Sequence, residues 1–268
     1  MPTIKILVSA ILISLHTVAS CSEVTSPAEK PGPNADIDKR VQALLTKVKR
    51  SLRPLKAGTF EMGDWGNEDG IPYDFDTHSR PLHKVTLDGF SMMAYKVTYD
   101  DFDVFTDATG NERISMDAQG IKHRAPNRPA GVSWHGAKAY CGWLAKLAKL
   151  PFDLPTEAQW EYAARSGGKK MLFATDNGKI ERGRNFPHKW KFGDPETIEI
   201  GGYPPNPAGL YGMSEDTKEW VIDWFDANYY KISPKRNPTG PESGTKKIKR
   251  GSVEGSAEIS AMVFMRTA

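Results

Sequence analysis

The sequence predicts a loop-rich domain in which short helices and short strands are mixed. Among its 268 residues are 24 glycines and 19 prolines, which favour turns and irregular loops over a bundle of long helices. Several short segments alternate like strands, and others begin with a residue that caps helices. Apolar residues make up 39% of the chain. That content allows one domain of roughly 200 residues or two smaller ones.

The first 20 residues have the features of a signal peptide. Lys5 supplies a positive charge, and the apolar run from Ile6 to Leu15 is too short to span a bilayer. Residues 18–21 read Val-Ala-Ser-Cys and resemble the lipobox of bacterial lipoproteins, in which the cysteine is lipidated and becomes the first mature residue. An ordinary secretory leader is the alternative. An aspartate directly after the cysteine commonly retains such lipoproteins at the inner membrane, but here Ser22 follows Cys21. We therefore expect a lipid anchor in the outer membrane, on its periplasmic side.

The mature chain would begin with a tether and a leading helix. Residues 21–35 are polar and rich in proline, so they cannot bury enough apolar surface to fold and should form a flexible tether. Residues 36–52 are predicted as the leading helix, and residues 53–268 as the domain. The net charge of +3 is too balanced to suggest nucleic-acid binding. The apolar residues of the leading helix recur at helical spacing: Val41, Leu44, Leu45 and Val48.

Two strands and two helices are predicted in the first half of the domain. Residues 57–63 and 82–87 have the pattern of short strands. Thr98 can cap a helix that ends at Gly110, and Ser133 can cap the next one.

Only two cysteines are present, Cys21 and Cys141. If Cys21 is lipidated, the mature chain can form no internal disulfide and no cysteine-rich metal site. Cys141 lies on the apolar stripe of the helix that follows Ser133. We therefore expect it to pack as a small hydrophobic residue rather than to act as a reactive thiol.

The most informative segment is residues 154–165, Leu-Pro-Thr-Glu-Ala-Gln-Trp-Glu-Tyr-Ala-Ala-Arg. Thr156 stands at an N-cap position with Gln159 three residues later, which predicts a capping box. Glu157 lies in the first turn, where the helix dipole favours an anion, and it shares a face with Glu161. We interpret the two carboxylates as structural, and a paired acid–base role is the alternative.

Together these segments resemble the formylglycine-generating enzyme domain, also called the sulfatase-modifying-factor domain. The resemblance covers about residues 53–268 and implies a compact α+β domain with much irregular loop, related to C-type lectins. The segments that carry it follow the family's own order: residues 58–63, 81–87, 97–102, 129–134 and 154–165.

The same resemblance implies that the family's chemistry is lost. Active members bind copper through two cysteines five positions apart, which follow a Lys/Arg-Gly-Gly strand, and two thiolates suit Cu(I). Residues 248–252 correspond to that strand, and counting forward without gaps puts Ser256 and Ala261 at the cysteine positions. Neither side chain can replace a thiolate. We therefore expect a pseudoenzyme with no catalytic residue and no certain cofactor.

Calcium is the one ion that the resemblance keeps open. Residues 209–220 depart from the family's calcium-binding turn, yet Asp216 and Glu219 are oxygen donors of the type that calcium takes. Asn185 corresponds to the asparagine of the family's other calcium site. A surface acidic turn without calcium is the alternative.

We expect a binding protein rather than an enzyme. Domains of this family recognise an extended polypeptide in a groove, which implies a protein partner. Bacterial lipoproteins with this domain resemble immunity or accessory proteins of type VI secretion systems. The leading hypothesis is therefore an immunity protein that neutralises a type VI effector, for example a phospholipase. The first alternative is a periplasmic regulator of a type VI secretion signalling pathway. The second is an enzyme with an unrecognised site, such as non-haem iron held by His78, His83 and Asp76.

Three irregular loops are the predicted contact surfaces, residues 64–80, 111–128 and 166–208. Their aromatic side chains are of the kind that dominates protein interfaces, and ordinary packing within the loops is the alternative. These aromatic residues are Trp65, Tyr73, Phe75 and Trp190.

Overall fold

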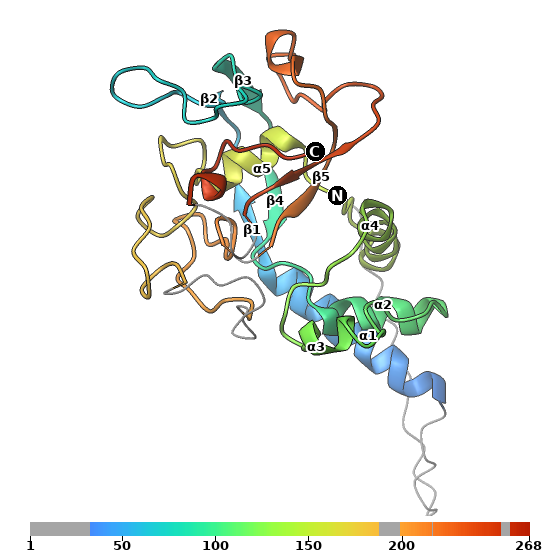
Figure 1. Ribbon diagram of the computed structural model, residues 1–268. Helices are drawn as coiled ribbons and strands as arrows, with labels where there is room; N and C mark the ends of the chain where they lie inside the picture. Colours follow the sequence, from blue (N-terminus) through green and yellow to red (C-terminus); the bar gives the residue numbers. More distant parts are fainter. Residues whose placement is uncertain (1–32, 188–198, 216, 253–257) are drawn as a thin grey trace, which may run out of the picture.

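The computed structural model describes residues 33–187, 199–215, 217–252 and 258–268. Helices and short strands are mixed in it, with long irregular connections, so the predicted α+β class is confirmed. Figure 1 shows a layer of helices against a more irregular part that contains the strands. No helix in the described ranges is long and apolar enough to cross a membrane. The predicted leader lies outside those ranges, as do Cys21, Trp190, Asp216 and Ser256.

The helical layer consists of α1 (Pro33–Ser51), α2 (Tyr99–Thr109) and α4 (Trp134–Ala148), with the short α3 (Gly120–His123) beside them. The leading helix thus begins three residues before the predicted start and ends one residue before the predicted end. Its apolar stripe packs against α2 and α4, and the buried residues of this cluster include Leu44, Val48, Phe102, Tyr140 and Leu144.

Caps define the ends of these helices as predicted. The Thr98 hydroxyl accepts from the amide of Asp101 at 3.2 Å, and the Asp101 carboxylate accepts from the amide of Thr98 at 3.3 Å. Gly110 ends α2 with a φ of 69°, in the left-handed region that favours glycine. The Ser133 hydroxyl accepts from the amide of Gly136 at 3.1 Å and caps α4.

The strands form antiparallel pairs. β1 (Leu52–Leu55) pairs with β4 (Phe90–Met93), and β2 (Gly58–Met62) pairs with β3 (His83–Leu87). The third pair joins β5 (Glu219–Trp224) to β6 (Lys247–Arg250), with an irregularity in its register. Single-turn 3-10 helices follow each of these last two strands, η1 (Tyr229–Lys231) and η2 (Glu258–Ala261).

A second core surrounds α5 (Glu157–Ala164), which lies between the β2–β3 pair and β5 (Figure 1). Trp160 is 1% exposed, and the small side chains of Ala163 and Ala164 allow close packing. Other buried residues of this core come from β1, β2, β3, β5, β6, η1 and irregular segments, and they include Phe60, Val85, Val221, Ile248 and Phe264. The short helix therefore brings distant parts of the chain together.

Candidate functional site

α5 begins at the capping box that the sequence predicts. The Thr156 hydroxyl accepts from the amide of Gln159 at 3.1 Å, and the Gln159 side chain accepts from the amide of Thr156 at 2.9 Å. The amide of Glu157 donates to the carboxylate of Asp223 at 2.8 Å. Because Asp223 lies on β5, this bond joins the start of the helix to the strand.

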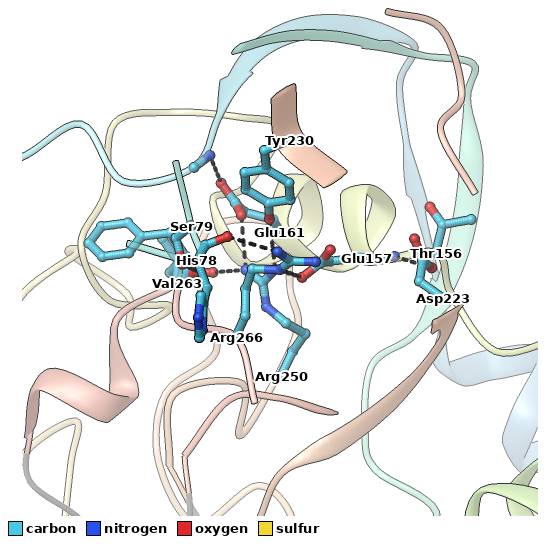
Figure 2. Close-up of polar contacts among 12 residues, drawn as sticks. His78, Ser79, Thr156, Glu157, Glu161, Asp223, Tyr230, Arg250, Val263 and Arg266 are labelled. Atoms are coloured by element: carbon cyan, nitrogen blue, oxygen red, sulfur yellow. Dashed lines mark hydrogen bonds and ion pairs between the residues drawn. The ribbon is translucent and has the colours of Figure 1, made fainter. Parts of the chain in front are cut away.

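A fully buried cluster of ion pairs lies along one face of α5 (Figure 2). Arg250 on β6 donates to Glu157 at 2.7 Å and to Glu161 at 2.9 Å. Arg266 donates to Glu157 at 2.7 Å, and Arg165 donates to Glu161 at 3.1 Å. All five side chains belong to residues that are 8% exposed or less. We call Glu157, Glu161, Arg165, Arg250 and Arg266 the ionic cluster.

The ionic cluster also binds backbone groups at the end of β2 and in the loop between β2 and β3. The Glu161 carboxylate accepts from the amide of Gly63 at 2.9 Å, at the end of β2. Arg266 donates to the carbonyl of His78 at 2.8 Å, in the loop between β2 and β3. Gly63 has a φ of 112°, and a Cβ atom there would lie 2.5 Å from the carbonyl oxygen of Ser79, so only glycine fits. The cluster thus fixes α5, β6, this loop and the segment after η2 to one another.

Charge balance in the ionic cluster sets the protonation of its neighbours. Burial alone would raise the pKa of Glu157, but the positive charges of Arg266 and Arg250 outweigh burial and lower it. Asp223 forms no ion pair with an arginine among the described residues, and the charge of Arg266 lowers its pKa only in part. Burial and the negative charge of Glu157 raise the pKa of Asp223 to about 7. Burial also raises the pKa of Tyr230, whose ring stacks on Arg266.

This geometry favours a structural role for the two carboxylates of α5. Each is buried and bound by arginine donors, so neither can reach a substrate proton in solution. Arg250 and Arg266 were not predicted from the sequence as their partners. One signal pointed to them: a buried helical face with two carboxylates needs nearby cations, and the alternation of residues 247–250 puts Arg250 on the same face as the buried Ile248.

The segment that contains Ala261 packs closely against neighbouring loops. Ala261 lies in η2 and is 1% exposed. Its carbonyl accepts from the Ser214 hydroxyl at 3.0 Å, and the same hydroxyl accepts from the amide of Ala174 at 2.7 Å. The amide of Val263 donates to the carbonyl of Leu172 at 2.9 Å. Ala261 is therefore buried and held in a defined position.

Comparison with known proteins agrees with this architecture. The family described as "Sulfatase-modifying factor enzyme 1-like domain" matches residues 45–268. The chain belongs to this family.

The relatives include enzymes whose chains are of different length. The formylglycine-generating enzyme of Mus musculus is 30% identical, over 74% of this chain and 64% of the mouse protein, so the chain spans just under two thirds of that enzyme. The formylglycine-generating enzyme of Streptomyces coelicolor is 32% identical, over 84% of this chain and 82% of that protein. The structure of PvdO from Pseudomonas aeruginosa superposes with a TM-score of 0.65 at 26% identity, covering 81% of this chain and 87% of PvdO.

Within the described ranges, Cys141 is the one cysteine, and it lies on α4 rather than in the segment after β6, where the resemblance expects the copper-binding cysteines. Cys141 is on α4, and burial raises the pKa of its thiol to about 12. It is therefore protonated at neutral pH and suited neither to binding a metal nor to nucleophilic attack. Of the two positions that the resemblance places at the family's copper ligands, Ala261 is described and carries a methyl group. Ser256 lies outside the described residues.

Basic side chains lie at both predicted calcium positions. The Lys96 ammonium is 3.2 Å from the Glu219 carboxylate and also donates to the carbonyl of Gly212. Two oxygen donors of this turn therefore already bind a cation. At the other position, the Asn185 oxygen accepts from the amide of Glu181 at 2.8 Å. As they stand, the described residues at these positions do not fit a calcium ion, and Asp216 lies outside the description.

Arg184 neutralises the carboxylates beside Asn185. It donates to Asp176 at 2.7 and 3.0 Å and also contacts Glu181. These hydrogen bonds lower the pKa of Asp176. The amide nitrogen of Asn185 donates to the same Asp176 carboxylate at 2.8 Å. The acidic loop is thus balanced by its own arginine.

The loop aromatics differ in what they contact. The Trp65 ring lies 5.1 Å from the Phe264 ring, and the Tyr73 ring lies 5.9 Å from it, so both pack onto the core. Phe75 is 86% exposed and is presented to solvent. Trp190 lies outside the described residues. Among the predicted contact residues, Phe75 therefore has the geometry that a partner could use.

His78 in the same loop and His83 at the start of β3 pack against aromatic rings. The His78 ring lies 5.4 Å from Phe225, and the His83 ring lies 4.6 Å from Tyr230. Within the described ranges, no group of three or more His, Cys, Asp and Glu side chains is arranged to hold a metal ion. The non-haem iron site imagined from His78, His83 and Asp76 is therefore not assembled.

Proposed function

We propose that this protein is a lipid-anchored, non-catalytic member of the formylglycine-generating enzyme family that binds a protein partner in the periplasm. The observation that carries the proposal is the buried alanine at position 261. Its buried methyl group occupies a position at which the resemblance expects a copper-binding cysteine, and a methyl group can neither bind a metal nor attack a substrate. The family fold can persist without the family chemistry, because fold and activity are separable.

The partner class that we propose is a toxic effector delivered by type VI secretion, for example a phospholipase, with this protein as the immunity factor. The lipobox-like segment that ends at Cys21 supports a periplasmic location, where such effectors act. An exposed aromatic side chain, Phe75, supports a contact surface on the loop between β2 and β3. The alternative role is an accessory of the secretion signalling pathway, in which the same surface would contact a kinase domain.

Copper binding tests the loss of chemistry. The purified protein should bind no stoichiometric Cu(I) and should leave the cysteine of a sulfatase-derived peptide unchanged, with the Streptomyces coelicolor enzyme as the positive control. A double variant, Ser256→Cys with Ala261→Cys, should gain Cu(I) binding if these positions correspond to the family's cysteine pair. Stoichiometric copper in the unaltered protein, or conversion of the peptide, would refute the non-catalytic proposal.

Protection of living cells tests the immunity role. A toxic effector encoded beside this gene is produced in the periplasm of a sensitive bacterium, with or without this protein. The unaltered chain should restore growth and form a complex with the effector. Phe75→Ala should weaken the complex, whereas Ile232→Ala, which removes another exposed hydrophobic side chain, should not. If the protein instead binds a periplasmic kinase domain and gives no protection, the regulatory alternative replaces the immunity role.

A further inference from the structure

An open groove runs along α1 where the helix meets β1. Its volume is about 650 Å³, within the range of sites for small ligands. Part of its wall is apolar, from Ala43, the Tyr95 ring and Ile200. Arg50 and Arg53 stand beside this wall. A concave surface with apolar and cationic parts fits an amphiphilic anion.

The two arginines carry charge that the described part of the chain leaves without a carboxylate partner. Arg53 donates to the backbone carbonyls of Arg50 and Leu52 at 3.1 and 3.3 Å, which bond its guanidinium without neutralising it. Arg50 is exposed, and no ion pair of the described residues includes it. By contrast, Lys47 in the same groove is paired with Asp101 at 2.7 Å. An anion in the groove would therefore meet two free positive charges.

The place of the groove in the chain indicates which anion lies within reach. α1 is the first described element, and Figure 1 shows it on the side of the molecule away from the connection between β5 and β6. Cys21 precedes Pro33 by 12 residues, so a fully extended tether would span at most about 40 Å. α1 has 19 residues and is about 28 Å long. An anchor at Cys21 would therefore keep the groove within reach of the lipid surface, at most about 70 Å from it.

We propose that the α1 groove binds the headgroup of an anionic phospholipid and thereby orients the domain on the membrane. This inference rests on the anchored location given under the proposed function, but its test does not need the anchor. The guanidinium groups of Arg50 and Arg53 contact the phosphate, and the apolar wall contacts the glycerol and upper acyl carbons. The groove then adds to the lipid anchor a second contact that sets the orientation of the domain on the membrane.

Vesicle binding by the unlipidated protein tests this inference. The mature chain from Cys21 onward, produced without lipid, is mixed with vesicles of phosphatidylethanolamine containing a quarter phosphatidylglycerol, and with vesicles in which phosphatidylcholine replaces the phosphatidylglycerol. Binding should require the anionic lipid and weaken at high salt. Removing a cation near the surface should weaken binding roughly fivefold, so Arg50→Gln with Arg53→Gln should weaken it about thirtyfold.

Matched variants separate the groove from a diffuse basic surface. Lys49→Gln with Lys56→Gln removes the same charge near the groove but outside its lining, and it should weaken binding much less. Lys235→Gln with Lys246→Gln removes the same charge on the β5–β6 connection and should change nothing. Arg50→Gln alone keeps the hydrogen bonds of Arg53 and guards against misfolding. The inference is overturned if anionic vesicles are not bound, if the first two double variants lose equal affinity, or if only an acidic protein partner binds. If the protein is found without a lipid anchor in cells but the purified protein still binds these vesicles, the proposed location is refuted and the inference about the groove still holds.

Discussion

Arg250→Met is the substitution that tests the ionic cluster most directly. Arg250 is fully buried and bridges Glu157 and Glu161, so its loss leaves Glu161 with Arg165 alone and Glu157 with Arg266 alone. Removing one member of a buried ion pair costs about 3–5 kcal/mol, and here both carboxylates would stay buried with one arginine fewer. At a urea slope of about 2 kcal/mol per M, the midpoint should fall by roughly 2 M.

Urea denaturation followed by tryptophan fluorescence measures this change. Lys249→Met is the control, because Lys249 is next to Arg250 but lies over the Trp220 ring on the other face of β6. It should cost less than about 1 kcal/mol. The loss caused by Arg250→Met should shrink at acid pH, because protonation removes the negative charges that have lost a partner. Equal losses for Arg250→Met and Lys249→Met would refute the argument that the buried charges depend on Arg250.

Four further predictions follow from the described contacts. Asp223, with its pKa raised to about 7, binds a proton in the folded state that the unfolded chain releases near pH 4, so the free energy of unfolding should fall as pH rises between these values. Asp223→Asn should flatten that part of the profile in urea denaturation at several pH values, and an unchanged slope would count against the assignment. Thr156→Ala removes the cap of α5 and should lower the free energy of unfolding by about 1 kcal/mol. Thr239→Ala, at an exposed threonine, is the control and should have no measurable effect. Similar urea midpoints for the two variants would contradict this prediction. The Cys141 thiol should react with iodoacetamide at least ~100-fold more slowly than free cysteine at neutral pH and at the ordinary rate in urea, unless the helix opens in the native state. Millimolar calcium should leave the melting temperature of the unaltered protein unchanged, because the Lys96 ammonium already pairs with Glu219. The melting temperature of Lys96→Met should rise when calcium is added. A calcium-dependent rise in the unaltered protein would show that Lys96 does not block calcium binding.

Local sequence signals predicted the caps and the helices because the groups that interact are close in the chain. Thr98 with Asp101 and Thr156 with Gln159 are three residues apart, and both capping boxes form. The apolar stripe of α1 predicted that helix for the same reason, because its residues are close together in the sequence. By contrast, β1 is only four residues long and contains a proline, so its pairing with β4 left little pattern to recognise.

The candidate site was harder to predict because its contacts are distant in sequence. Glu157 and Arg250 are 93 residues apart, and Glu157 and Arg266 are 109 residues apart. The packing of Trp65 and Tyr73 on Phe264 has the same origin, since a loop sequence does not state which core residue it will cover. The cation of Lys96 beside Glu219 could be found only once the two segments were placed together.

The separation of these partners has a consequence for how the protein is made. During synthesis, the carboxylates of α5 leave the ribosome together with Arg165 but long before Arg250 and Arg266, so the helix completes its ion pairs only after residue 266 has emerged. Nascent chains that stop before residue 250 would leave Glu157 with neither of its arginine partners, and burying a carboxylate without a partner destabilises the folded state. The charges of α5 can therefore be fully paired only late in synthesis.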